Sequence, residues 1–248
     1  MKYTYEELAG MIDHSLLHPA LTDHELEEGC RLAIRYKVAS VCIKPYAVRM
    51  AAQILNGTSV KVGTVVGFPH GNSTPEVKQF ETATACSEGA AEIDMVINIG
   101  KVLSREWAYV EREIGLICSE AHRRNAIVKV IFETDFLPTD DIKITLCKIS
   151  EEAGADFVKT STGFGFVKGP DGKYDYRGAT VHDVKLMRAA CSSRVRIKAA
   201  GGIRDLDTLI MFKELGVTRC GATATAQILD EYNRRAAAGA PMHNSTGA

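Results

Sequence analysis

Short apolar runs rich in β-branched residues alternate with longer amphipathic stretches along the whole chain. Eight such runs can be distinguished, at 11–13, 39–45, 60–68, 91–98, 127–134, 155–162, 194–202 and 218–223. Nearly continuous apolar runs are typical of strands that are buried on both faces, and strands that alternate with helices are parallel. The pattern therefore predicts a parallel sheet covered by helices.

The stretches between the runs contain helix starts. Capping-box spacing occurs at Thr22–Glu25, at Ser73–Glu76 and at Thr180–Asp183. Eight strand–helix units in 248 residues match the (β/α)8 TIM barrel, an α/β fold, and no linker rich in Pro, Gly or Ser divides the chain. We therefore predict one domain over 1–248, with a doubly wound open sheet as the alternative.

Two segments do not fit the repeat. Residues 166–177 form a polar insertion after the sixth strand, with Asp171 and Gly172 at the turn of an expected hairpin. Because loops after barrel strands emerge at the catalytic face, we expect this hairpin to act as a mobile lid, with a solvated excursion of no function as the alternative. The small residues of 236–248 predict a flexible tail.

Composition narrows the class of protein. The chain has 30 Lys and Arg against 31 Asp and Glu, a net charge of −1, which argues against partners such as nucleic acid or an anionic membrane. No apolar run is long enough for a membrane helix, and the first residues lack the apolar core of a signal peptide. The seven cysteines form no C-x-x-C pair, as expected for reduced thiols in the cytoplasm.

Charged residues inside apolar strands are the informative exceptions, because an unpaired buried ion is costly. They occur in four of the predicted strands: Asp94, Lys129, Glu133, Lys159 and Lys198. Catalytic groups of barrels come from the carboxyl ends of several strands. These positions are therefore the first candidates for chemistry.

Lys159 and Lys198 fall near the ends of the sixth and seventh strands, which are neighbours in a barrel. Two close ammonium groups repel, and burial also disfavours the charged form, so one of them is expected to be neutral near pH 7. A neutral lysine attacks carbonyl groups and forms a Schiff base. The alternative is that these lysines extend from the rim of the barrel into solvent, or form structural ion pairs with Asp94 and Glu133.

Glycines after the last two strands indicate a phosphate site. Gly201 and Gly202 follow the seventh strand, and Gly221 and Thr223 follow the eighth. Barrels often bind phosphate with these two loops, through N–H groups at a helix start. Gly-Gly pairs are also common in ordinary turns, so the position in the fold carries this prediction.

Other polar residues are less specific. Cys42 lies in the second strand, where it either faces substrate or is an inert buried thiol. His14 and His18 have a spacing that could bind metal on a helix, but Pro19 interrupts the segment and no third ligand is evident. We therefore predict no metal and no cofactor.

Asp94, the motif VKTSTGFG around Lys159 and the motif KAAGGIR around Lys198 together resemble the deoxyribose-phosphate aldolase family of class I aldolases. The resemblance extends from the segment MIDHSLL, which contains Asp13, to GATA near the end of the chain. It implies that Lys159 forms the Schiff base, that Lys198 perturbs it, and that Asp94 belongs to the proton relay with Asp13 as a helper. Thr160, from the first motif, is expected to contact substrate.

The resemblance also implies a reaction, the reversible cleavage of 2-deoxy-D-ribose 5-phosphate to glyceraldehyde 3-phosphate and acetaldehyde. The expected partners are this sugar phosphate and the aldehydes, and the chain is expected to be able to form a homo-oligomer. Many family members have serines after the eighth strand, where this chain has threonines, which leaves the strength of phosphate binding open. The alternatives are a Schiff-base aldolase for another sugar phosphate, an inactive phosphate-binding barrel, and a metal-dependent aldolase.

Overall fold

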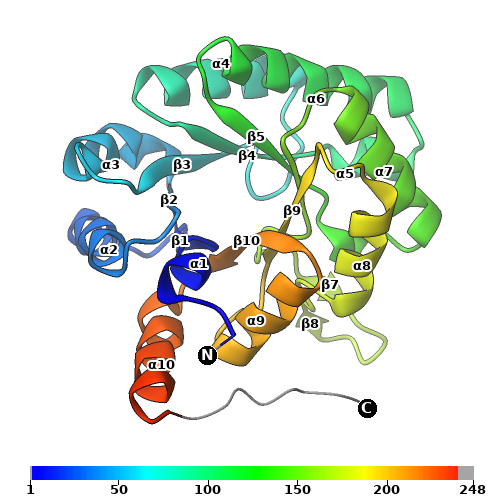
Figure 1. Ribbon diagram of the computed structural model, residues 1–248. Coiled ribbons are helices and arrows are strands. Elements are labelled where there is room, and N and C mark those ends of the chain that lie inside the picture. Colours follow the sequence, from blue (N-terminus) through cyan, green and yellow to red (C-terminus); the bar gives the residue numbers. More distant parts are fainter. Residues whose placement is uncertain (1, 240–248) are drawn as a thin grey trace.

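A computed structural model describes residues 2–239, and in it eight parallel strands close into a barrel (Figure 1). Each strand pairs with its neighbours in the order β1-β10-β9-β6-β5-β4-β3-β2. The barrel strands are β1 (Ile12–Leu16), β2 (Ser40–Ile43), β3 (Lys61–Val66), β4 (Glu92–Val96), β5 (Ile127–Ile131), β6 (Phe157–Lys159), β9 (Arg196–Ala200) and β10 (Val217–Ala222). The closed order confirms the TIM barrel and excludes the open sheet.

Helices surround the strands on the outside (Figure 1). They are α1 (Tyr5–Ala9), α2 (Asp23–Tyr36), α3 (Val48–Leu55), α4 (Pro75–Ser87), α5 (Ile99–Leu103), α6 (Trp107–His122), α7 (Asp140–Glu152), α8 (Val181–Ala190), α9 (Leu206–Glu214) and α10 (Thr225–Ala237), with 3-10 turns η1 (Pro45–Ala47) and η2 (Thr134–Phe136). No helix within 2–239 is long and apolar enough to cross a bilayer.

Side-chain caps decide where several helices begin. Thr22 and Glu25 form the predicted reciprocal capping box of α2. Thr180 accepts a hydrogen bond from the N–H of Asp183 at the start of α8. At α4 the prediction was one residue early, because Thr74 rather than Ser73 is the N-cap and directly precedes the proline at the first helical position.

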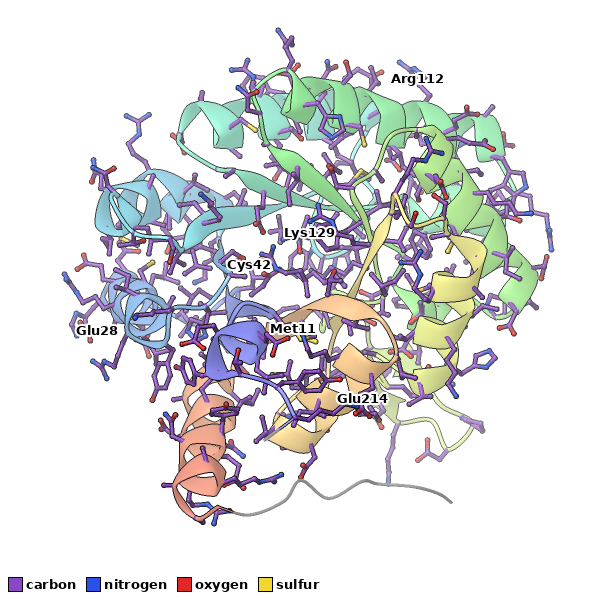
Figure 2. The ribbon with its side chains drawn as sticks, viewed as in Figure 1. Met11, Glu28, Cys42, Arg112, Lys129 and Glu214 are labelled. Atoms are coloured by element: carbon purple, nitrogen blue, oxygen red, sulfur yellow. The ribbon has the colours of Figure 1, made fainter. Side chains whose placement is uncertain are left out.

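The apolar core lies mainly between the strands and the helices. Ile93 and Val128 of the strands and Leu26, Ile114 and Leu146 of the helices are all buried. By contrast, the interior of the barrel contains charged side chains, and Figure 2 shows Lys129 among the strands while Glu28 and Arg112 lie on the outer helices. The charged side chains inside the barrel make its interior the place to search for a functional site.

The insertion after β6 forms the expected hairpin. β7 (Val167–Lys168) pairs antiparallel with β8 (Tyr174–Asp175), and the N–H of Gly172 donates to the carbonyl of Gly169 at the turn. Whether the hairpin moves as a lid stays a prediction. At the end of the chain, α10 includes the first two residues of the predicted tail, and residues 240–248 lie outside the described part.

Candidate active site

The two lysines singled out from the sequence are directly opposite each other on paired strands. Lys159 is the last residue of β6 and pairs in register with Lys198 of β9. Both are nearly buried, with exposed fractions of 3% and 1%. Neighbouring residues in a parallel ladder point to the same face, so both side chains enter the barrel. The predicted adjacency of the two strands is confirmed.

Asp94 of β4 joins these lysines. Its Oδ2 accepts hydrogen bonds from Lys159 Nζ at 2.7 Å and from Lys198 Nζ at 2.7 Å. The other oxygen, Oδ1, lies 3.0 Å from Lys129 Nζ, but the alignment is not that of a hydrogen bond. One buried carboxylate therefore contacts three ammonium groups.

Asp13 of β1 continues the chain of ion pairs toward the amino ends of the strands. Its Oδ2 accepts from Lys198 Nζ at 2.5 Å and from Lys129 Nζ at 3.0 Å, and its Oδ1 accepts from Arg219 Nε at 2.6 Å. Arg219 also donates to both oxygens of Glu92. We call the seven residues of this network the interior charge cluster: Asp13, Glu92, Asp94, Lys129, Lys159, Lys198 and Arg219.

The interior charge cluster contains three carboxylates and four basic groups. If every basic group were protonated, these seven residues would carry a net charge of +1, and a buried charge without a partner costs several kcal/mol or more in a medium of low polarity. The positive and negative charges of the cluster are equal in number when one lysine is neutral. Lys159 is the best placed for this, because it contacts one carboxylate, whereas Lys198 contacts two.

The pKa shifts agree with this balance. Burial lowers the pKa of Lys159, and the charge of Lys198 lowers it further, although Asp94 opposes both. Burial alone would also lower the pKa of Lys198, but Asp13 and Asp94 outweigh it and raise that pKa. Burial would raise the pKa of Asp94, but the surrounding ammonium groups hold it below its usual range. Repulsion between the lysines thus acts in the predicted direction, but burial is the larger cause.

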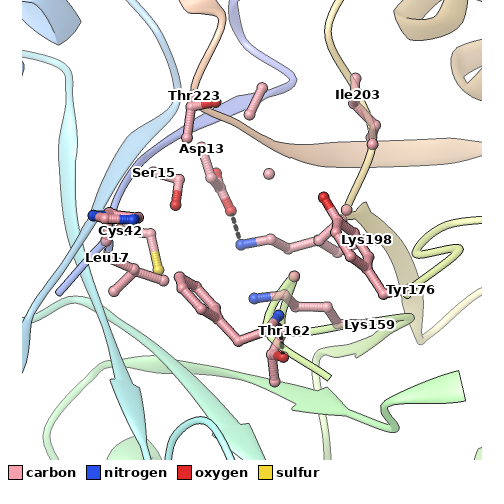
Figure 3. Close-up of a pocket in the computed structure, with 18 of the residues that line it drawn as sticks. Asp13, Ser15, Leu17, Cys42, Lys159, Thr162, Tyr176, Lys198, Ile203 and Thr223 are labelled. Atoms are coloured by element: carbon pink, nitrogen blue, oxygen red, sulfur yellow. Dashed lines mark hydrogen bonds and ion pairs between the residues drawn. The ribbon is translucent and has the colours of Figure 1, made fainter. Parts of the chain in front are cut away.

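A cavity of about 440 Å³ opens above the two lysines (Figure 3). Lys159, Lys198 and Asp13 form part of its polar floor, and Figure 3 shows both ammonium ends beside it. Carboxyl ends of barrel strands and the loops that follow them supply the other lining residues: Ser15, Leu17, His18, Pro19, Cys42, Thr162, Gly163, Phe164, Phe166, Tyr176, Ala200, Gly201, Gly202, Ile203, Arg204, Gly221, Ala222 and Thr223.

The predicted phosphate residues Gly201, Gly202, Gly221 and Thr223 all line this cavity. Gly201 and Gly202 have φ angles of 90° and 84°, which L-residues with side chains rarely adopt. The loops after β9 and β10 differ in how the helix that follows each of them is capped. Asp205 caps α9, so the free N–H groups expected there are partly occupied, whereas the N-cap of α10, next to Thr223, has no side-chain cap.

Of two other residues that were predicted to contact substrate, one lines the cavity and one does not. Cys42 lines the cavity, and burial raises the pKa of its thiol. Thr160 does not line it, because its hydroxyl donates to the carbonyl of Ala200 and accepts from the N–H of the same residue, tying β6 to β9. Thr162, two residues further, reaches the cavity instead. Thr160 is therefore not retained among the substrate contacts.

Sequence reasoning missed two parts of the site. Glu92 and Arg219 belong to the interior charge cluster. The only sign of this in the sequence was that each is a charged residue inside a predicted strand. Phe164 lines the cavity from the segment after β6, and its aromatic character was the only signal. Tyr176 also lines the cavity, and it belongs to the insertion that the sequence places at the catalytic face. Their partners are distant in sequence, so no local pattern reveals them.

A family model described as "DeoC/LacD family aldolase" matches residues 8–222. The chain is 46% identical over 233 residues to the deoxyribose-phosphate aldolase of Rhodopirellula baltica, covering 94% of this chain and 92% of the relative. It is also 46% identical over 229 residues to the deoxyribose-phosphate aldolase of Caldanaerobacter subterraneus, covering 92% of this chain and 94% of the relative.

Solved structures agree. A putative deoxyribose-phosphate aldolase from Coccidioides immitis superimposes with a TM-score of 0.85 at 37% identity, covering 93% of this chain and 87% of that one. The deoxyribose phosphate aldolase from Aeropyrum pernix, described as a unique tetrameric structure, has a TM-score of 0.82 at 29% identity, covering 93% of this chain and 92% of that one.

A closed (β/α)8 barrel with a charged cavity at the carboxyl ends of its strands has the architecture of a barrel enzyme. The matched family model covers most of the chain, and the relatives align nearly from end to end. The chain belongs to the DeoC/LacD family of aldolases, which makes it a carbon–carbon lyase.

Proposed function

We propose that this enzyme reversibly cleaves 2-deoxy-D-ribose 5-phosphate to D-glyceraldehyde 3-phosphate and acetaldehyde through a Schiff base on Lys159. The observation that carries the proposal is the hydrogen-bonded group of Lys159, Asp94 and Lys198 at the floor of an open cavity. It supplies an amine whose pKa is lowered, a carboxylate within reach of it and a second cation. The names of the relatives suggest the substrate.

The first step joins the Lys159 nitrogen to C1 of the open-chain sugar. The amine attacks the aldehyde and water leaves, giving a protonated imine that withdraws electrons. A base removes the proton of the C3 hydroxyl, the C2–C3 bond breaks, and its electron pair moves into the imine to form an enamine. Glyceraldehyde 3-phosphate leaves as the C3 carbonyl forms.

The remaining steps restore the enzyme. The enamine takes a proton at C2 to become the imine of acetaldehyde, and water then hydrolyses it to acetaldehyde and free Lys159. Asp94 relays protons at the imine nitrogen, and its hydrogen bonds to both lysine nitrogens support this role. Asp13 positions Lys198 through their ion pair.

The phosphate group binds between the loops after β9 and β10. Gly201 and Gly202 offer backbone close to the cavity, Thr223 adds a hydroxyl, and the uncapped start of α10 favours an anion. Arg204 lines the same side and supplies positive charge. The only serine to line the cavity among the described residues is Ser15, so the threonine hydroxyl carries the role expected of the serines in related proteins.

Reductive trapping tests the proposal. The protein is treated with acetaldehyde and sodium borohydride, digested, and mapped by mass spectrometry. The expected result is an ethyl group on Lys159, absent in a Lys159→Met variant. Label on another lysine, or none, would contradict the assignment. Trapping without turnover of 2-deoxyribose 5-phosphate, but with turnover of another sugar phosphate, would retain the Schiff base and replace the substrate.

The oligomeric state and the cytoplasmic location stay predictions. Light scattering of the purified protein tests for a homo-oligomer, and a monomeric mass at micromolar concentration would contradict it.

A further inference from the structure

The inserted hairpin is fixed to the barrel at its base. Asp135, in the turn after β5, accepts hydrogen bonds from the N–H groups of Arg177 and Gly178, each at 2.9 Å. Its side chain is only 2% exposed. The N–H of Ala179 donates to the carbonyl of Gly201, which connects the same base to the proposed phosphate loop. The last residues of the insertion therefore have a defined position relative to that loop.

Tyr176 is the side chain that this base presents to the cavity. It is half-buried, lines the cavity, and packs against Phe166 with the rings edge to face and centroids 5.3 Å apart. A Cβ atom built on Gly201 would lie 3.4 Å from Cε2 of the Tyr176 ring, so the ring adjoins the phosphate loop. Figure 3 shows its hydroxyl end directed toward the interior of the cavity on the side of Ile203.

The hydroxyl of Tyr176 forms no hydrogen bond within the part of the chain that the structure describes. A phenol oxygen beside a loop that binds an anion is a ready donor, and hydrogen bonds to charged groups are the stronger ones. The loop after β10 contributes the Thr223 hydroxyl alone to the cavity. A further donor from the opposite wall would complete the coordination of a phosphate.

We propose that Tyr176, carried by the inserted hairpin, binds the substrate by donating a hydrogen bond to its phosphate group, and so sets the preference for phosphorylated over unphosphorylated sugars. This proposal rests on the proposed function for the identity of the substrate. The chemical group that it requires is a phosphate monoester, and the hairpin then acts as a wall of the binding site.

Tyr176→Phe tests the hydrogen bond while keeping the ring and its contact with Phe166. We expect KM for 2-deoxyribose 5-phosphate to rise about tenfold or more with little change in kcat, and KM for 2-deoxyribose to change less than about twofold. Tyr174→Phe is the matched control, because Tyr174 lies on the same hairpin but is 68% exposed and does not line the cavity. It should leave both substrates unaffected.

A second measurement does not depend on catalysis. Inorganic phosphate is titrated into the parent, Tyr176→Phe and Tyr174→Phe proteins by calorimetry, and only Tyr176→Phe should bind it more weakly, by about tenfold. Equal KM changes for both sugars, or unchanged phosphate affinity, would overturn the proposal. So would a Tyr176→Ala variant with raised KM for both sugars beside a normal Tyr176→Phe, because the ring would then be an apolar wall alone.

Failure of the two proposals can be told apart. If borohydride traps acetaldehyde on Lys159 in Tyr176→Phe but phosphate binding is unchanged, the Schiff base stands and the role of Tyr176 is wrong. If phosphate binding weakens as expected but no lysine is trapped in the parent, the phosphate contact stands and the aldolase mechanism is wrong.

Discussion

Two regions of the molecule bury a lysine against a carboxylate. In the outer layer, Lys78 of α4 contacts Glu113 of α6 at 2.6 Å, and both side chains are fully buried. In the barrel interior, Lys159 contacts Asp94 at 2.7 Å. Burial lowers the pKa of both lysines, against the opposing effect of the carboxylate. The direction of the pKa shift therefore does not distinguish the two regions.

Hydrogen bonding does distinguish them. Lys78 Nζ donates to Glu113 and to the carbonyls of Gly71 and Val96, which uses all three protons of its ammonium group. Lys159 Nζ has a single acceptor among the described residues, Asp94, and faces an open cavity. A saturated ammonium group has no free position for a reactant. An unsaturated one beside a cavity does.

The charges around Lys78 balance, whereas those around Lys159 do not. The ammonium of Lys78 is matched by one carboxylate, so the pair is neutral with both groups ionised. The interior charge cluster is neutral only when one of its basic groups has lost a proton. The reactive lysine is therefore distinguished by its incomplete hydrogen bonding and by the excess positive charge around it. A lysine that is only buried against one carboxylate forms a structural ion pair.

The largest expected effect comes from removing the amine itself. Lys159→Met should lower kcat by at least about 10⁴-fold, because Asp13 and Asp94 keep Lys198, the other amine that lines the cavity, in its charged and non-nucleophilic form. Steady-state cleavage of 2-deoxyribose 5-phosphate measures this, with circular dichroism as the check on folding. A folded variant that keeps a few per cent of the parental rate would remove Lys159 from the mechanism.

Asp94→Asn should lower kcat by about 10²-fold or more, because the amide cannot accept a proton in the relay. It also removes one negative charge from the interior charge cluster. The measurement is single-turnover kinetics, which separates chemistry from product release. Near-normal rates would show that Asp94 has a structural role only.

Lys198→Met changes the pH profile. Loss of this cation raises the pKa of Lys159, so a smaller fraction of the amine is neutral at a given pH. The acid limb of the kcat/KM profile should therefore move to higher pH by about one unit. An unchanged limb would mean that burial alone sets the pKa of Lys159.

Lys78→Met should have the smallest effect on turnover and a clear effect on stability. It leaves the Glu113 carboxylate buried without its cation, which costs about 3–5 kcal/mol of unfolding free energy. Urea denaturation measures this loss, and kcat per folded molecule should match the parent. Adding Glu113→Leu should recover part of the stability. A large loss of kcat in Lys78→Met would erase the contrast between the regions.

Much of the fold and part of the site follow from the sequence by itself. Most of the apolar runs are nearly continuous because their strands are buried on both faces, and the eight repeats with parallel connections permit few arrangements. Once that order holds, the last residue of β6 and the centre of β9 must be neighbours, so Lys159 and Lys198 meet. Capping residues act within one turn, which is why Thr22 and Thr180 were predictable.

Only the tertiary structure decided which charges pair and which side chains face the substrate. Arg219 and Asp13 are brought together by the closure of the barrel between β10 and β1, and no local spacing records that contact. Tyr176 and Tyr174 look equivalent in the sequence, yet the hydrogen bonds of Asp135 place one beside the cavity and leave the other in solvent. Local patterns encode secondary structure, whereas pairing between distant charges depends on distances that only the closed barrel defines.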